Sequence, residues 1–270
     1  MDQLIYHYTD LNSLLGIIGS DSKNLTFWGS RYDCMNDPLD YQFAKNRLLP
    51  KMMDVAYEIS KEQNFPKYAL KEIDTIPYIV SFSKKKDDFL MWRMYNAKVA
   101  LVLDKCYFSE AMPNRALIEC EYVDQGLSNI RESFFRIDEQ ISNCINISAN
   151  TSRISTFIKE KSFETEGEVR LATWDYYDKD GNKLILSDCK EDGKSVCSEV
   201  KSRVNANGKM VLFKKFYIDK NSLAGIIVHS YSQVEFKNIQ NILRSFLISK
   251  SFSREVFENI TLTNAYPFNL

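Results

Sequence analysis

The alternation of apolar and polar positions predicts strands and helices that follow one another without a regular order. Aromatic and branched residues at Leu4–Tyr8 and at Pro77–Ser83 are typical of strands. Apolar residues at helical spacing predict one helix from Leu11 to Ile18 and another from about Gln233 to Leu247. Because the order lacks the regular strand and helix repeat of a doubly wound sheet, it favours an α+β fold.

A strand with charged residues on one face is predicted near the middle of the chain. Side chains alternate along a strand, so Glu166, Glu168 and Arg170 project together, while Val169 and Leu171 point into a core. Two carboxylates and one guanidinium on a strand edge form a candidate site. The same pattern also fits a solvated strand face with an exposed Glu–Arg pair, which contributes little to stability.

The composition fits a single domain over residues 1–270. The chain is 44% hydrophobic, which is enough for a substantial core, and its 9 Gly and 6 Pro form no stretch that resembles a linker. The formal net charge of -1 gives no electrostatic argument for a surface that coats nucleic acid, although a local basic patch is compatible with it.

The N-terminus and the cysteines lead us to expect a cytoplasmic protein. The start Met1-Asp2-Gln3 has no basic region followed by an apolar stretch, and no segment reaches membrane-spanning length. The six cysteines are scattered and are therefore expected as reduced thiols. We expect no zinc site, because no Cys pair has CxxC spacing and His7 and His229 are far apart.

Short blocks of unusual composition stand out along the chain, at Tyr6–Thr9, Asn36–Pro38, Ser81–Ser83, Met91–Tyr95 and Glu166–Arg170. Together they resemble a family of uncharacterised bacterial proteins over most of the chain. That family is in turn similar, at a distance, to the ADP-ribosyltransferases, in which a split pair of sheets grips NAD. The resemblance implies a split two-sheet ADP-ribosyltransferase-like core with surrounding helices, and NAD as a substrate.

The resemblance assigns the catalytic roles to the two glutamates. Glu168 would stabilise the positive charge that develops when the nicotinamide–ribose bond breaks. Glu166 would orient or activate the acceptor, as the first Glu of an ExE motif does in such transferases. Arg170 would hold Glu168 ionised or contact a diphosphate.

Four further residues would bind NAD. His7 would contact the ribose on the nicotinamide side and Thr9 the adenosine ribose, whereas Ser83 would orient the glutamate and Tyr95 would stack on nicotinamide. Phe82 departs from the transferase pattern, which has Thr there. Three of these residues also have a structural interpretation: His7 as a half-buried histidine bonded to backbone, Thr9 as a helix cap, and Tyr95 as core packing.

Two polar segments have plain structural interpretations. Asn36-Asp37-Pro38 is typical of a helix start, and Asp37 is an alternative contact for an acceptor. The run Lys84-Lys85-Lys86 is typical of a solvated turn and, in a substrate loop, would contact phosphate.

Three functional classes follow. The leading hypothesis is an enzyme that transfers ADP-ribose from NAD to a protein or nucleic acid, or hydrolyses NAD, and the resemblance implies a toxin or antiphage effector. The second is a metal-dependent nuclease using Glu119-x-Glu121 and Glu166-x-Glu168, although no lysine follows on the strand as expected. The third is a binding or sensor module without chemistry. An open cleft shared by His7, Ser83 and Glu168 would favour an enzyme.

Overall fold

The computed structural model describes residues 4–35, 38–62, 74–108, 116–145, 151–177, 180–184, 190–191, 194–195, 199–204 and 208–263. In these residues the chain forms one large mixed sheet, two small sheets and flanking helices, so the predicted α+β class is confirmed. The helices are α1 (Leu11–Gly19), α2 (Pro38–Phe43), α3 (Leu49–Glu62), α4 (Phe89–Met94), α5 (Ile130–Ile145), α6 (Thr151–Ser155), α7 (Gln233–Ser249) and α8 (Arg254–Glu258).

The large sheet contains eleven strands within the described residues. They are β1 (Leu4–Thr9), β2 (Asn24–Arg31), β3 (Asp74–Ser83), β4 (Val99–Asp104), β5 (Ala116–Glu119), β8 (Glu168–Tyr177), β9 (Lys183–Leu184), β12 (Lys201–Val204), β13 (Met210–Asp219), β14 (Leu223–Val228) and β15 (Ile260–Leu262). The main path runs β12-β13-β2-β3-β1-β4-β14-β15, and β8 joins β3 to β5 and β9. The small sheets pair β6 (Glu121–Val123) with β7 (Ile158–Glu160), and β10 (Lys190–Glu191) with β11 (Lys194–Ser195).

Strand β3 is the point where the sheet divides. Along one edge β3 pairs with β8 over its whole length. Along the other edge it pairs first with β2, at Ile79 opposite Ser30, and then with β1, at Ser83 opposite Tyr6. Since β1 and β2 share this edge at different levels, they diverge from each other around Ser81.

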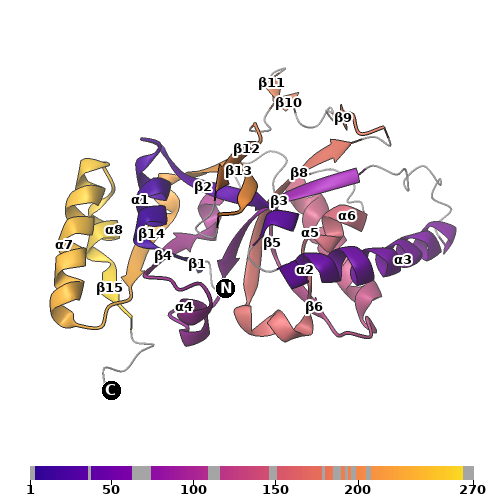
Figure 1. Ribbon diagram of the computed structural model, residues 1–270, viewed down its shortest axis with the longest axis horizontal. Coiled ribbons are helices and arrows are strands. Elements are labelled where there is room, and N and C mark those ends of the chain that lie inside the picture. The colour runs from indigo at the N-terminus through magenta and orange to yellow at the C-terminus, as the bar shows by residue number, and fades with distance from the viewer. Residues whose placement is uncertain are drawn as a thin grey trace.

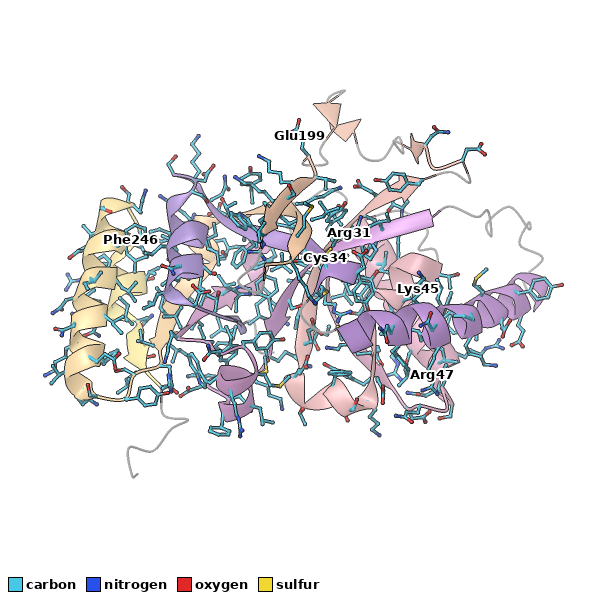
Figure 2. All side chains as sticks on the ribbon, in the orientation of Figure 1. Arg31, Cys34, Lys45, Arg47, Glu199 and Phe246 are labelled. Carbon is cyan, nitrogen blue, oxygen red and sulfur yellow. The ribbon has the colours of Figure 1, made fainter. Side chains whose placement is uncertain are left out.

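The helices gather at the two ends of the sheet (Figure 1). Helices α1, α7 and α8 lie at one end, and α2, α3, α5 and α6 lie at the other, with α4 to one side between them. Asp10 caps α1 through the N–H of Ser13, as a polar residue at the predicted helix start should. In α7, Phe246 points toward α1 (Figure 2), where a Cβ placed on Gly19 would lie 3.3 Å from its ring.

Alternation along the strands divides the interior into clusters on opposite faces of the sheet. The largest cluster holds α1 and α7 against one face and includes Phe27, Phe82 and Leu171. On the other face, one cluster lies under α2, α3, α5 and α6, and a smaller one lies under α4 with Tyr6 and Trp92. The second face of the sheet therefore carries two separate apolar clusters, one under α2, α3, α5 and α6 and one under α4.

Some predicted elements differ from the structure. The sequence pattern alone predicts a last strand near Glu255 to Leu262, but this segment forms the short helix α8 followed by β15. The pattern also predicts helices between about Ser128 and Lys161, but the last helix there, α6, ends at Ser155, and β7 follows and pairs with β6. Within the described part of the chain, no helix combines the length and apolar character needed to cross a bilayer.

Candidate functional site

A cavity of about 840 Å³ opens where β1 and β2 diverge. Its volume lies in the range of about 300–1,000 Å³ that is usual for small-molecule sites. All seven residues predicted for catalysis or NAD binding line it: His7, Thr9, Ser83, Tyr95, Glu166, Glu168 and Arg170. The fold thus brings together residues that are up to 163 positions apart, since 170 minus 7 is 163.

Glu168 is the first residue of β8 and is 3% exposed. One carboxylate oxygen accepts a hydrogen bond from Arg170 Nε at 3.0 Å, and the other accepts one from Lys159 Nζ at 2.7 Å. Burial alone would favour the neutral acid, but Arg170 and Lys159 outweigh it and lower the pKa of Glu168 to about 2. Glu168 is therefore a fixed negative charge in the cavity wall.

Glu166 reaches the same cluster by a different route from the one predicted. It does not lie on the strand with Glu168, because it ends the 3-10 helix Lys161–Glu166. Gly167 follows with φ of 53°, a left-handed conformation that suits glycine, and turns the chain into β8. The Glu166 carboxylate still contacts Lys159 Nζ at 2.8 Å, and the same amine binds Glu168. The two glutamates therefore lie together as predicted, joined by a shared lysine.

The two glutamates differ in ionisation. Burial raises the pKa of Glu166 above its usual value, and the attraction of Lys159 offsets this only in part. Glu168 has two cationic partners, Arg170 and Lys159, whereas within the described part of the chain the Glu166 carboxylate has a hydrogen bond to Lys159 alone. Two carboxyl groups whose pKa values are moved in opposite directions are the usual arrangement for one fixed charge and one proton acceptor.

Lys159 and Asp40 belong to the cluster although the sequence patterns did not single them out. Lys159 lies on β7 and is 4% exposed, and Asp40 lies in the first turn of α2 and is 3% exposed. Burial lowers the pKa of Lys159, but Glu168, Asp40 and Glu166 more than compensate and keep the amine protonated. Asp40 could have been considered because it follows the Asn36–Pro38 block by two positions. Lys159 could have been considered because it directly follows the apolar residues Phe157 and Ile158, which are typical of a buried segment.

The Arg170 guanidinium is fully engaged within the protein. It is 0% exposed and binds Glu168 through Nε, the carbonyl oxygen of Thr156 through one terminal nitrogen at 2.7 Å, and Asp40 through the other. Of the two roles considered for Arg170, holding Glu168 ionised fits these contacts, whereas a diphosphate contact would require breaking one of them. Three carboxylates against two cations leave the ionised cluster with a net charge of -1.

Ser83 joins the cluster to the neighbouring strand. It lies opposite Glu168 in the β3–β8 ladder and is completely buried. Its hydroxyl donates to the carbonyl oxygen of Glu166 at 2.6 Å and accepts from the N–H of Lys85 at 3.0 Å. Ser83 therefore positions the Glu166 backbone, which is close to the predicted role of orienting a glutamate.

His7 lies in the gap between the diverging strands. Its Nδ1 contacts the carbonyl oxygen of Ser81 at 3.0 Å, and its ring lies against Phe27 and Phe82. Burial lowers the pKa of His7, and a carbonyl only accepts, so the neutral ring carries its proton on Nδ1. Nε2 is then a hydrogen-bond acceptor for a ligand hydroxyl, while the Nδ1 bond matches the structural interpretation.

Tyr95 and Thr9 both line the cavity and come from different elements. Tyr95 is the C-cap of α4, and burial followed by the charges of Glu168 and Glu166 raises the pKa of its phenol. Thr9 ends β1, where its carbonyl accepts from the N–H of Lys98. The cap of the next helix is Asp10, so the alternative interpretation of Thr9 as that cap is wrong.

Glu119, Glu121 and the run Lys84–Lys86 do not line the cavity. Glu119 is paired with Lys84 at 2.8 Å and Lys105 at 3.2 Å, and Glu121 is paired with Arg136 at 3.4 Å. Among the described residues, no group of three or more His, Cys, Asp or Glu side chains has the arrangement of a metal site. Asn36 and Asp37 fall outside the described residues. Pro38 is the first residue of α2, which agrees with the predicted helix start.

No protein-family model, curated protein or solved structure matches this chain. The resemblance to a bacterial family, and through it to the ADP-ribosyltransferases, stays a prediction. The site is therefore interpreted from its own contacts and charges.

Proposed function

We propose that the cavity binds NAD and breaks its nicotinamide–ribose bond, so that ADP-ribose passes to a protein or nucleic-acid acceptor or to water. The observation that carries the proposal is the convergence of His7, Ser83, Tyr95, Glu166 and Glu168 on one cavity. The proposal is further supported by the position of the cavity where β1 and β2 diverge along β3, since the resemblance to split-sheet transferases implies an NAD site between diverging strands.

The charge of the cluster suits this reaction. When the bond breaks, nicotinamide leaves with the bonding electron pair, and the ribose carbon takes on oxocarbenium character. The oxidised nicotinamide ring is itself a cation. An ionised Glu168, as part of a cluster of net charge -1, stabilises both, and it needs no reorganisation because Arg170 and Lys159 already fix it.

Glu166 supplies the complementary role of proton acceptor. Its raised pKa brings it closer to neutral pH than an ordinary carboxyl, which suits the removal of a proton from an acceptor hydroxyl or from water. The oxygen of that acceptor then forms the new bond to the ribose carbon. Ser83 holds the Glu166 backbone, and His7 Nε2 is available to accept from a ribose hydroxyl.

The direct test follows nicotinamide release from NAD by the purified protein, with and without cell lysate as a source of acceptors. Glu168→Gln removes the fixed charge with little change of shape and should lower the rate by about 10²–10³-fold. Glu258→Gln, on the exposed face of α8 away from the cavity, is the matched control and should leave the rate unchanged.

The outcomes separate the functional classes. Release without lysate indicates hydrolysis, and release that needs lysate indicates transfer. If the wild type releases no nicotinamide under either condition, the proposal is wrong and a binding module becomes the better interpretation. Equal rates for wild type and Glu168→Gln would contradict the role of Glu168.

A further inference from the structure

The end of the cavity away from the glutamates has no assigned role. It is formed by the strands β2, β13 and β12, which lie side by side in the sheet (Figure 1). Trp28 and Thr26 of β2 lie on one face, and Arg203 of β12 and Val211 of β13, directly opposite each other, complete the wall. This end therefore belongs to the same cavity as Glu168 but to a different part of the chain.

Arg203 is held on an aromatic surface. Its guanidinium lies 5.2 Å from the centre of the Trp28 ring and 5.9 Å from that of Phe213. The two rings are stacked with centres 4.7 Å apart and planes inclined by 22°. Trp28 is 44% exposed, although large aromatic side chains are usually buried. The stack thus presents a cation and part of an indole ring to solvent and to the cavity.

Arg203 also differs from the other cations of the cavity wall. Lys159 and Arg170 are each paired with carboxylates, whereas Arg203 has no ion pair among the described residues. Among the described residues the cavity is therefore bipolar, with a net negative charge around Glu168 at one end and, at the other, a positive charge that forms no ion pair with them.

Two buried hydroxyl groups add an independent indication of a ligand. Thr26 Oγ1 and Ser81 Oγ both belong to residues of the cavity wall, and neither has a hydrogen-bond partner within the described part of the chain. Thr26 is only 2% exposed. Buried polar atoms are normally bonded, so a ligand with hydroxyl or phosphate oxygens would satisfy them.

We propose that this end of the cavity binds the adenosine diphosphate part of the dinucleotide. Arg203 binds the diphosphate by charge-assisted hydrogen bonds, and the exposed part of Trp28 contacts the base. The hydroxyl groups of Thr26 and Ser81 form hydrogen bonds with ribose or phosphate oxygens of the same ligand. This inference rests on the proposed function, because the positive nicotinamide and the negative diphosphate of NAD match the two ends of the bipolar cavity.

Binding of ADP and adenosine, measured by calorimetry, tests the proposal without requiring turnover. Arg203→Gln should weaken ADP binding at least tenfold and adenosine binding much less, because only ADP carries the charge. Trp28→Ala should weaken both. Arg203→Lys should restore part of the ADP affinity, and Lys201→Gln, an exposed charge on the same strand outside the cavity, should have no effect.

Tryptophan fluorescence gives a second readout. Trp92 and Trp174 are each 2% exposed, so a ligand that contacts the exposed indole should change mainly the emission of Trp28. The change on adding ADP should disappear in Trp28→Phe, while circular dichroism shows that the variant is folded.

Each outcome bears on the proposal. No ADP binding by the wild type, or equal ADP binding by wild type and Arg203→Gln, overturns it. Binding of a single-stranded oligonucleotide that ADP does not displace assigns the surface to nucleic acid and overturns it as well. ADP binding that depends on Arg203 without nicotinamide release would leave this subsite standing while the proposed reaction fails. The reverse result, nicotinamide release with an unchanged KM in Arg203→Gln, would retain the reaction and reject the subsite.

Discussion

Strand β8 carries buried charges on both of its faces, and the two sets differ in what surrounds them. On one face, Glu168 and Arg170 belong to a cluster of five charged groups in the wall of the cavity. On the other, Asp175 forms a pair with Lys214 of β13 at 2.5 Å, and the amine lies over the ring of Tyr78. Both members of that pair are at most 1% exposed, and neither lines the cavity.

The comparison shows how a structural ion pair differs from a candidate site built of the same residue types. The Lys214–Asp175 pair has equal and opposite charges, is fully buried and lies outside the cavity wall. The cluster around Glu168 has an excess negative charge, two carboxyl groups with opposite pKa shifts and an opening toward a ligand. Burial of charge is common to both, so burial alone does not mark a functional site.

The largest effect on stability is expected at the structural pair. Lys214→Met leaves Asp175 buried without its cation and should lower the free energy of unfolding by about 3–5 kcal/mol. Urea denaturation measures this loss. The rate of nicotinamide release per folded molecule should stay the same, because Lys214 does not line the cavity.

A double variant sharpens the interpretation of this pair. In Lys214→Met/Asp175→Leu no buried charge remains, so most of the lost stability should return. A double variant as unstable as Lys214→Met alone would show that the pair contributes through more than mutual neutralisation.

The charged cluster around Glu168 should make the stability of the fold depend on pH in the acidic range. The pKa of Glu168 is about 2 in the folded protein and near 4.5 when unfolded, so Glu168 stabilises the fold above pH 4.5. This contribution, roughly 3 kcal/mol at most, is lost as the pH falls from 4.5 toward 2. Unfolding measured across that window should therefore depend less on pH in Glu168→Gln than in the wild type.

Glu166 should have the opposite dependence. Because its pKa is raised in the folded protein, Glu166 favours the fold at pH values below its unfolded pKa and loses this contribution as the pH rises through its folded pKa. Stability curves of Glu168→Gln and Glu166→Gln that deviate from wild type in the same direction would contradict the assignment of the two carboxyls.

The rate of the proposed reaction should follow Glu166 at acidic pH. As a proton acceptor Glu166 must be ionised, so the rate should rise with pH through its raised pKa. Glu166→Gln should lower the rate by about 10²-fold and remove this acid limb. A pH–rate profile of the variant that keeps the same limb would assign it to another group.

Within the cluster, the smallest effect is expected at Ser83, which positions the Glu166 backbone and carries no charge. Ser83→Ala removes the hydrogen bonds to the Glu166 carbonyl and the Lys85 N–H, and should cost about 1–3 kcal/mol of unfolding free energy. The exposed pair of Arg254 and Glu258 serves as a control for this loss of stability. Arg254→Ala should change the free energy of unfolding by no more than about 0.5 kcal/mol. Thermal unfolding of both variants compares them directly.

Local patterns along the chain were enough to predict much of the fold. The alternation at Pro77–Ser83 corresponds to β3, and the apolar spacing after Gln233 corresponds to α7. They did not predict the 3-10 turn that ends at Glu166, because the turn depends on one glycine in a left-handed conformation within a segment that alternates like a strand. They also missed β7, whose three residues gain their strand form only by pairing with β6.

The short blocks, together with the resemblance that they carry, named His7, Ser83, Glu166 and Glu168 as site residues, and all four line the cavity. Only the tertiary structure added Lys159, Asp40 and Arg203. The contact between Asp40 and Arg170 spans 130 positions, and no periodicity within a segment records such a distance. Ionisation was decided at the same level, because a pKa depends on burial and on neighbouring charges, and both exist only once distant segments have packed together.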